Sequence, residues 1–352
     1  MGRTIAVTGV SGYLGSRVAA TLAADSDVDC IVGIDVAPPP GEGFLDELEF
    51  HEIDIRDPDL GKFITGADTI VHLAFVLDPM RDETEMADVN LGGMRNVLDA
   101  AEDAGVLNVV YTSSASAYGA HPDNAVPLHE SDRLRANADF SYGAHKMESE
   151  HILRDWMPDH PDVVVTVLRP AIVLGTHVSN FISRTLEAPR LLSLRGHSPP
   201  FQAVHEDDAV SAVSHVTLER IPGTFNVAAD DVATHDDLAE LVGRGRLEVD
   251  AGVARRIAAA AWRLGQAEAP PGVVDYFMYP WVVSNEALRS TGWTPRHTTR
   301  EALAEMVAAN SDFVTLGRAR RTRAEWRRIG AVTAAAGTAA TALAAAALRL
   351  RR

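Results

Sequence analysis

Three side chains that could move a proton fall at two places in the middle of the chain. Ser114 stands in the serine-rich run 111–116, and Tyr142 is followed four residues later by Lys146. Residues i and i+4 share one face of a helix, and an ammonium held beside a phenol lowers the pKa of that phenol. A hydroxyl at the end of a strand can hydrogen-bond the substrate oxygen. The pattern predicts acid–base catalysis by Tyr142, helped by Lys146, with Ser114 polarising the substrate.

A glycine pattern near the N-terminus predicts where a hydride acceptor would bind. Its glycines separate a β-rich run, 4–8, from a helical pattern, 16–24. In this setting the first glycine allows a tight turn, the second lets the backbone approach a pyrophosphate, and the third lets the helix pack on the strand. Free N–H groups at the start of the helix then face the phosphates. The residues expected to contact the cofactor here are Gly9, Gly12, Tyr13, Leu14 and Gly15.

An acidic residue completes the dinucleotide pattern. A second strand pattern, 29–34, ends at Asp35, about 20 residues downstream, where a carboxylate can bind both ribose hydroxyls of an adenosine. The same charge would repel a 2′-phosphate, and no arginine follows it directly. We therefore expect the cofactor to be NAD and not NADP.

The elements that must position these residues alternate regularly. Apolar strand patterns recur at 49–53, 69–74, 106–112 and 163–168, and helical patterns fill 58–64, 84–104 and 141–157. Near-continuous apolar runs are typical of strands buried in a parallel sheet. The alternation predicts an α/β fold, a Rossmann-type doubly wound parallel sheet with right-handed crossovers.

The alternation loosens after residue 170. Eight prolines break the next stretch into short pieces, which is typical of a lobe of loops above the strand ends; a returning strand, 224–228, and a last helix, 300–309, remain recognisable. We expect a NAD-binding core over 1–170, a smaller C-terminal substrate lobe with returning core elements over 171–312, and an Arg/Ala-rich tail over 313–352.

Composition limits the class of partner. A formal net charge of −17 disfavours nucleic-acid binding, because a phosphate backbone would be repelled over most of the surface. One cysteine, Cys30, excludes a disulfide framework, and no signal-peptide pattern precedes the first strand. We expect a cytoplasmic enzyme with a small-molecule substrate. No metal is expected: the consecutive side chains of 205–208 diverge, and they are interpreted as the start of a helix.

These motifs together resemble the extended short-chain dehydrogenase/reductases, the NAD-dependent epimerase/dehydratase family, over about residues 3–310. The resemblance rests on the glycine pattern with Asp35, on Ser114 with Tyr142-x-x-x-Lys146, and on several shorter motifs: Asp54-Ile55-Arg56, His72-Leu73-Ala74, Asn90 before a helix, Tyr118-Gly119, Arg169-Pro170 and Val204-His205-Glu206-Asp207-Asp208.

The resemblance implies further roles for matching residues. Asp54 and Ile55 would flank the adenine, and Leu73 and Ala74 would line the cofactor. Asn90 would support the active-site network, Tyr142 and Lys146 would also contact the cofactor, and the turn after Pro170 would cover the nicotinamide. The family also implies a homodimer in which the helices predicted at 84–104 and 141–157 pair across a two-fold axis.

Departures from family patterns bear on the reaction. Nucleotide-sugar dehydratases, which this chain otherwise resembles, carry an Asp-Glu pair directly after the catalytic hydroxyl. This chain has Ala115-Ser116 at the matching positions, which argues against a dehydratase. Nucleotide-sugar epimerases commonly carry an arginine at the position of Phe201, where it holds the substrate diphosphate. Arg184, Arg190 or Arg195 could substitute, although the apolar neighbourhood of Phe201 suggests a less anionic substrate.

Three functions remain open on the sequence. The leading interpretation is an NAD-dependent oxidoreductase that interconverts a secondary alcohol and a ketone. The alternative is a sugar or nucleotide-sugar epimerase that keeps NAD bound. A non-catalytic NAD(H)-binding regulator is the third, and the presence of Ser114, Tyr142 and Lys146 argues against it.

The tail has its own pattern. A run of arginines between 318 and 328 precedes roughly 20 uncharged, mostly alanine residues at 329–348, a length that could span a bilayer. Alanine buries little apolar surface and has the highest helix propensity, so a frayed helix in water is the competing interpretation. We expect a flexible tail that brings the protein to a membrane surface; a spanning anchor and the absence of any membrane role are the alternatives.

Overall fold

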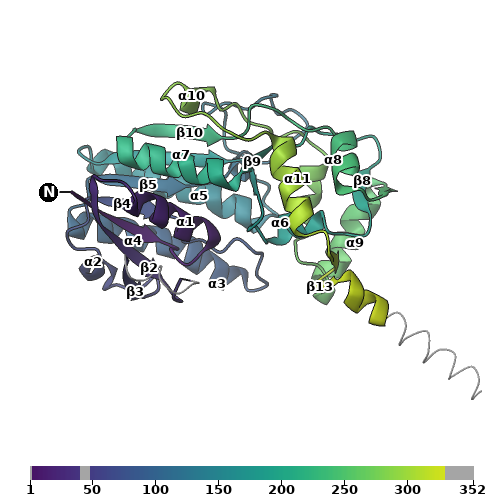
Figure 1. Ribbon diagram of the computed structural model, residues 1–352, viewed down its shortest axis with the longest axis horizontal. Coiled ribbons are helices and arrows are strands. Elements are labelled where there is room, and N and C mark those ends of the chain that lie inside the picture. Colours follow the sequence, from purple (N-terminus) through teal and green to yellow (C-terminus); the bar gives the residue numbers. More distant parts are fainter. Residues whose placement is uncertain (1, 40–47, 330–352) are drawn as a thin grey trace, which may run out of the picture.

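The computed structural model describes residues 2–39 and 48–329, and a parallel sheet lies at the centre of its larger lobe (Figure 1). Within these residues the sheet has seven strands in the order β10-β6-β5-β4-β1-β2-β3, and each adjacent pair is parallel. The strands are β1 (Arg3–Thr8), β2 (Val28–Asp35), β3 (Glu49–Glu52), β4 (Thr69–His72), β5 (Asn108–Thr112), β6 (Val164–Pro170) and β10 (Gly223–Val227). The predicted doubly wound sheet is confirmed.

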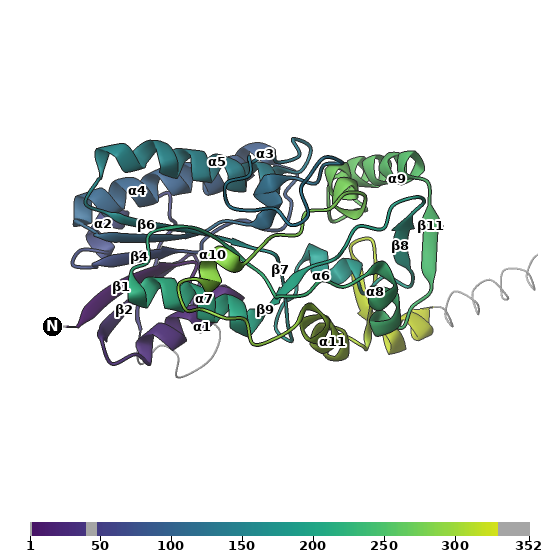
Figure 2. The ribbon, with the colours of Figure 1, turned by 90° about the horizontal axis from the view of Figure 1, so that it is seen from above.

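Two helical layers cover the sheet because successive strand residues point to opposite faces. Ile5 and Val7 of β1 pack with α1 (Tyr13–Ala23) and α7 (Glu206–Glu219), whereas Ala6 between them belongs to the other apolar cluster. Figure 2 shows α1 and α7 on one side of the sheet and α4 and α5 on the other. This second layer consists of α2 (Leu60–Phe63), α4 (Gly93–Ala104) and α5 (Ser141–Trp156), and α5 is followed by the 3₁₀ turn η4 (Met157–Asp159).

The helix predicted over 84–104 is not continuous. It consists of α3 (Glu83–Ala87), one π-helical turn η2 (Asp88–Gly92) and α4. Asn90 lies in the π turn and is buried, and its side chain holds the backbone of Val76 on both sides: Val76 N donates to Oδ1 at 2.8 Å, and Nδ2 donates to Val76 O at 3.3 Å. The wider turn thus aims Asn90 at the loop after β4.

The smaller lobe extends from the carboxyl ends of the strands, on the right in Figures 1 and 2. The short parallel pair of β7 (Ile172–Leu174) and β9 (Ala203–His205) leads into it. Its helices are α6 (Phe181–Thr185), α8 (His235–Val242), α9 (Ala251–Leu264) and α11 (Thr299–Ala309), and its strands β8 (Leu191–Leu194) and β11 (Arg246–Val249) pair in parallel. The 3₁₀ turns η3 (Ala115–Tyr118) and η5 (Pro271–Phe277) lie near the site, and α10 (Glu286–Arg289) contacts β10.

The structure corrects the expected start of a flexible tail. Residues beyond 312 form an antiparallel hairpin, β12 (Phe313–Leu316) and β13 (Ala319–Thr322), and then a helical segment, 323–329. Glu187 fixes the hairpin, because this buried carboxylate accepts hydrogen bonds from Thr315 at 2.7 Å and from Arg320 at 2.9 Å.

The expected membrane segment at 329–348 lies almost entirely outside the described residues, which end at Ile329. None of the helices between residues 2 and 329 that the structure describes has the length and apolar character of a membrane crossing.

Candidate functional site

The residues singled out from the sequence gather at the carboxyl ends of neighbouring strands. Gly9 follows β1, Leu73 follows β4, Ser114 follows β5 and Pro170 ends β6. Because β1, β4, β5 and β6 are adjacent and parallel, these positions lie along one edge of the sheet. Ligands of open α/β sheets bind at this edge.

The glycine turn has the close backbone approaches that the sequence predicts. Gly9 has φ +74°, and a Cβ there would lie 2.6 Å from the backbone nitrogen of Ala74. A Cβ on Gly15 would overlap the Gly9 carbonyl oxygen, so only glycine lets α1 pack this close to β1. Gly12 caps α1 without a side-chain hydrogen bond to its first turn. The backbone N–H groups of Tyr13, Leu14 and Gly15 fit a pyrophosphate at this helix start.

Asp35 lies beside the same turn. Its carboxylate accepts hydrogen bonds from the backbone nitrogens of Ser11 at 2.9 Å and Val36 at 2.8 Å. The carboxylate thereby joins the end of β2 to the glycine turn, which is where an adenosine ribose meets the protein in this arrangement.

A buried polar pair fixes the strand end that carries Leu73 and Ala74. Thr8 Oγ1 lies 2.7 Å from His72 Nδ1, and Ala74 N donates to Thr8 Oγ1 at 3.3 Å. Burial lowers the pKa of His72 to about 3, so this ring is neutral near pH 7. A neutral ring can hold its neighbour by hydrogen bonding without adding a charge to the floor of the site.

The loop at Asp54 and Ile55 is fixed from two sides. Arg56 donates to Asp54 at 2.7 Å, and this hydrogen bond lowers the pKa of the Asp54 carboxyl. Asn96 Nδ2 donates to the carbonyl oxygens of Ile55 at 2.7 Å and Asp57 at 2.8 Å. The loop is therefore held against α4 beside the end of β3.

Asn90 connects two walls of the site. Besides its contacts with Val76, its Nδ2 lies 3.3 Å from His145 Nδ1 on α5. Burial lowers the pKa of His145. Asn90 therefore joins the loop after β4 to the helix that carries Tyr142 and Lys146.

Ser114 and Tyr142 meet at the end of β5. Ser114 caps η3, since its Oγ accepts from Ser116 N at 3.1 Å, and Ser116 Oγ lies 2.9 Å from the same oxygen. Burial raises the pKa of Tyr142 to about 12, and a hydrogen bond with Ser114 opposes this shift. A lowering of the pKa of Tyr142 by Lys146, as the sequence predicts, does not outweigh burial in this arrangement, because desolvation of the phenolate is the largest cause of the shift.

Lys146 is buried and points at the end of β5. Its Nζ donates to Thr112 O at 2.7 Å and lies 3.6 Å from the centroid of the Phe75 ring. Burial lowers the pKa of Lys146 to about 7, whereas the charge of Glu150 acts in the opposite direction. Phe75 also meets the Tyr142 ring edge-on at 5.6 Å between centroids. Phe75 thus contacts both members of the Tyr-x-x-x-Lys pair.

A buried ion pair supports this arrangement from below. Arg169 Nη2 lies 2.6 Å from Glu150 Oε2, and both side chains are almost fully buried. Ser113 Oγ also donates to Glu150, and Arg169 Nη1 donates to the Tyr118 hydroxyl at 2.7 Å. The network ties α5 to the ends of β5 and β6, so the helix carrying Tyr142 is fixed relative to Ser114.

Sequence reasoning missed three residues of this region. Phe75 follows the His72-Leu73-Ala74 motif directly, and Glu150 stands four residues after Lys146 on the same helix face, so spacing could have indicated both. Tyr276 donates its hydroxyl hydrogen to Ser116 O at 2.9 Å from η5, 160 residues away in the chain. No local pattern reveals that contact.

Apolar side chains surround Tyr142 on the substrate-lobe side. This cluster comprises Met86, Phe140 and Phe181 with partly buried Phe75, Val76, Leu77, Met80, Ile182, Ala269, Val273 and Tyr276. Among the arginines considered for a diphosphate, Arg184 lies on α6 with Phe181 of this cluster, and it pairs with Glu268 at 2.7 Å and with Asp78 at 3.1 Å. Phe201 packs with the apolar core of the smaller lobe, and its backbone pairs with Ala233.

The sequence 205–208 begins a helix, as expected. His205 caps α7, since its Nδ1 accepts from Asp207 N at 3.1 Å, and its Nε2 lies 3.0 Å from Glu305. His205, His297 and Glu305 offer ligand atoms within 4.8 Å of one another. The hydrogen bonds of His205 account for both of its ring nitrogens, so we assign the cluster to the cap of α7.

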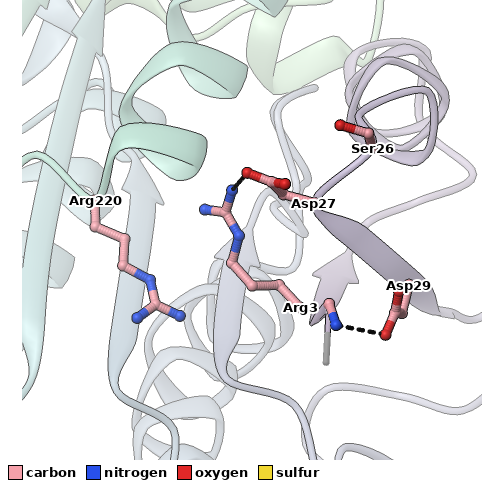
Figure 3. A pocket seen from close by; sticks show the side chains of 6 residues that line it. Arg3, Ser26, Asp27, Asp29 and Arg220 are labelled. Carbon is pink, nitrogen blue, oxygen red and sulfur yellow. Dashed lines mark hydrogen bonds and ion pairs between the residues drawn. The ribbon is translucent and has the colours of Figure 1, made fainter.

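A surface depression lies at the opposite, amino end of the sheet (Figure 3). Arg3 and Arg220 line it, and each pairs with a carboxylate: Arg3 with Asp27 at 3.6 Å and Arg220 with Asp68 at 2.9 Å. Its position and its compensated charge separate it from the site at the carboxyl ends.

Comparison with known proteins agrees with this geometry. Residues 5–228 match the NAD dependent epimerase/dehydratase family. An uncharacterized protein of Mycobacterium tuberculosis is 27% identical over 249 residues, which are 69% of this chain and 66% of that protein. A lipid-linked sugar epimerase of Escherichia coli O157:H7, N-acetyl-alpha-D-glucosaminyl-diphospho-ditrans,octacis-undecaprenol 4-epimerase, is 31% identical over 185 residues, half of each chain. The matched region thus spans just under two thirds of the first relative and half of the second.

Solved structures show the same fold. UDP-glucose 4-epimerase of Thermotoga maritima superposes with a TM-score of 0.67 at 20% identity, covering 88% of this chain and 98% of that one. UDP-glucuronic acid 4-epimerase of Bacillus cereus, solved in complex with NAD, superposes with a TM-score of 0.66 at 17% identity over the same shares.

Proposed function

Because the chain belongs to the NAD-dependent epimerase/dehydratase family and is an NAD-dependent enzyme, we propose that it is a 4-epimerase of a sugar carried on a diphosphate. The observation that carries this proposal is the relationship to a 4-epimerase of lipid-linked sugars at 31% identity. It favours the epimerase alternative over an enzyme that releases a ketone. The carrier of the sugar would be a nucleotide or a polyprenol.

The proposed chemistry assigns one task to each side chain. NAD would be held by the glycine turn, the first N–H groups of α1 and Asp35, and would supply a reversible acceptor for the C4 hydride. Tyr142, in its phenolate form, would take the proton from the C4 hydroxyl and give it back, while Ser114 would hydrogen-bond the same oxygen. Lys146 would bind the cofactor ribose and keep positive charge near the phenolate. Every atom removed in the first half is returned, so no net oxidation occurs.

The surroundings of Tyr142 support such a turnover. The sugar must present both faces of C4 to one fixed nicotinamide, so it must turn while its carrier stays bound. The side chains around Tyr142 are mainly apolar, and such walls impose few fixed hydrogen bonds on the turning ring. Arg184 is the cation that we propose for the diphosphate, because α6 carries it beside Phe181 and Ile182 of this apolar cluster; the diphosphate would replace its ion pairs with Glu268 and Asp78.

Product analysis tests the proposal directly. The purified protein with NAD is incubated with UDP-glucose, UDP-N-acetylglucosamine and polyprenyl-diphospho-N-acetylglucosamine, and both the C4 epimer and the absorbance of NADH are followed. Appearance of the epimer without accumulation of NADH is expected. Stoichiometric NADH with a keto product would instead support the second candidate, an alcohol dehydrogenase, which the apolar residues around Tyr142 also suit.

Two properties of the assembly belong to the same proposal. We propose a homodimer formed by α4 and α5 of two subunits, as the family resemblance implies; sedimentation at micromolar concentration should give twice the chain mass.

We also propose that the basic segment after residue 317 contacts a membrane surface. Extraction of full-length protein from membranes by high salt is expected, whereas resistance to both salt and alkaline carbonate would indicate a spanning anchor.

A further inference from the structure

The outward face of α9 is composed of apolar and basic residues alone. Val253, Ile257 and Leu264 are 39%, 60% and 71% exposed, which is unusual for large aliphatic side chains in one helix. Their spacing of four and seven places them on one face. The other exposed residues of this helix between 253 and 264 are Arg256, Ala260 and Arg263. The face therefore has an apolar stripe with arginines along one side and no acidic residue.

The opposite face of α9 packs against the rest of the smaller lobe. Ala254 and Ala258 pack in an apolar cluster with Leu194 and Val274. Arg255, which points to this side, forms an ion pair with Asp275 of η5. Since the inward contacts already hold the helix, the outward stripe is not needed for folding.

The C-terminal hairpin lies next to the end of α9. A Cβ on Gly317, at the tip of the hairpin, would overlap the carbonyl oxygen of Gln266, so the tip lies against the end of α9. Leu316 at this tip is 49% exposed, and Arg318 follows it. Figure 1 shows β13 and the helical segment after it at the same end of the molecule as α9. Two segments distant in sequence thus present the same combination of aliphatic and arginine side chains.

We propose that the outward face of α9 and the hairpin tip form a docking surface for an anionic membrane. A helix with an apolar face and arginines beside it lies in the interface of a bilayer, with its aliphatic side chains in the acyl boundary and its guanidinium groups among the phosphates. The chain carries −17 overall, yet both charged side chains of this face, Arg256 and Arg263, are positive. Complementarity to phosphate favours a lipid surface over a symmetric contact with a second copy, because that contact would bring the arginines of the two faces together.

The docking surface is connected to the candidate site. The loop after β4 donates from Arg81 to the carbonyl oxygen of Trp262 in the last turn of α9, at 2.8 Å. On the other side α9 packs against η5, whose Tyr276 bonds to Ser116. Lipid contact would therefore bring both walls of the site next to the bilayer. The proposal does not depend on the identity of the substrate.

Vesicle flotation with the full-length protein tests the docking surface. Wild type, Ile257→Glu/Leu264→Glu and Arg256→Glu/Arg263→Glu are compared on vesicles of phosphatidylcholine alone and of phosphatidylcholine with phosphatidylglycerol. We expect wild type to float with the anionic vesicles, and each double variant to bind about 25-fold more weakly, since each basic residue near such a surface contributes about fivefold and each buried aliphatic group contributes at least as much. Leu107→Glu is the matched control, because Leu107 is 51% exposed at the amino end of the sheet.

Two results would overturn the proposal. If both double variants float like wild type, the C-terminal tail alone binds lipid and the face of α9 does not. If wild type fails to float while sedimentation shows that Ile257→Glu/Leu264→Glu reduces its assembly state, the face is a contact between protein copies. Unchanged NAD binding in every variant shows that a loss of flotation does not come from misfolding.

Discussion

Tyr142 and Lys146 are both buried, and burial shifts the pKa of each against its charged form: Tyr142 upward to about 12 and Lys146 downward to about 7. The i, i+4 spacing in the sequence indicates only the mutual attraction of the two groups, which favours phenolate and ammonium. Desolvation acts on each group separately and is the larger effect here. The residues that can offset it are their neighbours, Ser114 for Tyr142 and Glu150 for Lys146.

Removing the phenol hydroxyl should separate catalysis from cofactor binding. Tyr142→Phe is expected to lower kcat by about 10²–10⁴-fold, because general acid–base catalysis contributes that much. NAD binding should be retained, since the ring still packs between Phe75 and Phe140. Turnover and cofactor titration measure the two effects. A variant with near-normal turnover would show that the proton moves through another group.

Glu150 should set the alkaline limit of activity. Lys146 acts as a cation, so its effective fraction falls as the pH rises through its pKa of about 7. The carboxylate of Glu150 favours the ammonium; without that charge the pKa falls further. In Glu150→Gln the descending limb of kcat/KM should therefore move to lower pH. Glu148→Gln, on the outer side of the same helix, should leave the pH profile unchanged, and an unmoved limb in Glu150→Gln would exclude this role.

The packing of the turn between β1 and α1 requires that residue 15 has no Cβ atom. Gly15→Ala places a methyl group against the Gly9 carbonyl oxygen, and neither backbone can withdraw without moving the helix from the strand. We expect a loss of about 1–3 kcal/mol in the free energy of unfolding, and weaker NAD binding. Denaturant titration and cofactor titration measure these two effects.

Gly61→Ala is the control for that substitution. Gly61 lies in the short helix α2, and a Cβ there would have its nearest neighbour at 3.5 Å, an ordinary contact. Alanine should leave stability unchanged or raise it by about 0.5–1 kcal/mol, since glycine is unfavourable inside a helix. Equal effects of the two substitutions would contradict the packing argument at Gly15.

The strands and helices of the sheet could be predicted because each has a recognisable pattern of apolar residues in its own sequence. The apolar runs 4–8 and 163–168 correspond to β1 and β6, and the pattern 141–157 corresponds to α5. The π turn at Asn90 could not be predicted, because it is stabilised by contacts with Val76, fourteen residues earlier. The sequence does not indicate the hairpin at 313–322 and instead predicts part of a basic tail there. The residue that stabilises the hairpin, Glu187, is distant in sequence.

At the scale of the whole molecule, some parts of the site can be recognised from local sequence motifs, whereas others depend on contacts between distant residues. The cofactor turn, Asp35, and the set of Ser114, Tyr142 and Lys146 fall in motifs a few residues long and are recognisable directly. The smaller lobe contributes its walls through single long-range contacts, such as Tyr276 to Ser116 and Arg184 to Asp78. Substrate specificity therefore depends on the smaller lobe, whose arrangement is the hardest to predict from local sequence patterns.

The C-terminal hairpin should behave as part of the folded body. Truncation after Asp312 removes Thr315 and Arg320, and with them the hydrogen bond and the ion pair that satisfy the carboxylate of Glu187. Breaking a buried ion pair from one side costs about 3–5 kcal/mol. A chain ending at Ile329 keeps both partners and should match the full-length protein in denaturant titrations.

Arg320→Ala in the full chain separates the ion pair from the rest of the hairpin. It should reproduce most of the loss caused by truncation after Asp312, because Arg320 bonds to Glu187 through both Nε and Nη2. Arg321→Ala, on the neighbouring exposed position of β13, is the matched control and should change little. If the chain ending at Asp312 proves as stable as the one ending at Ile329, the hairpin would be an appendage and the lobe would end where the composition changes.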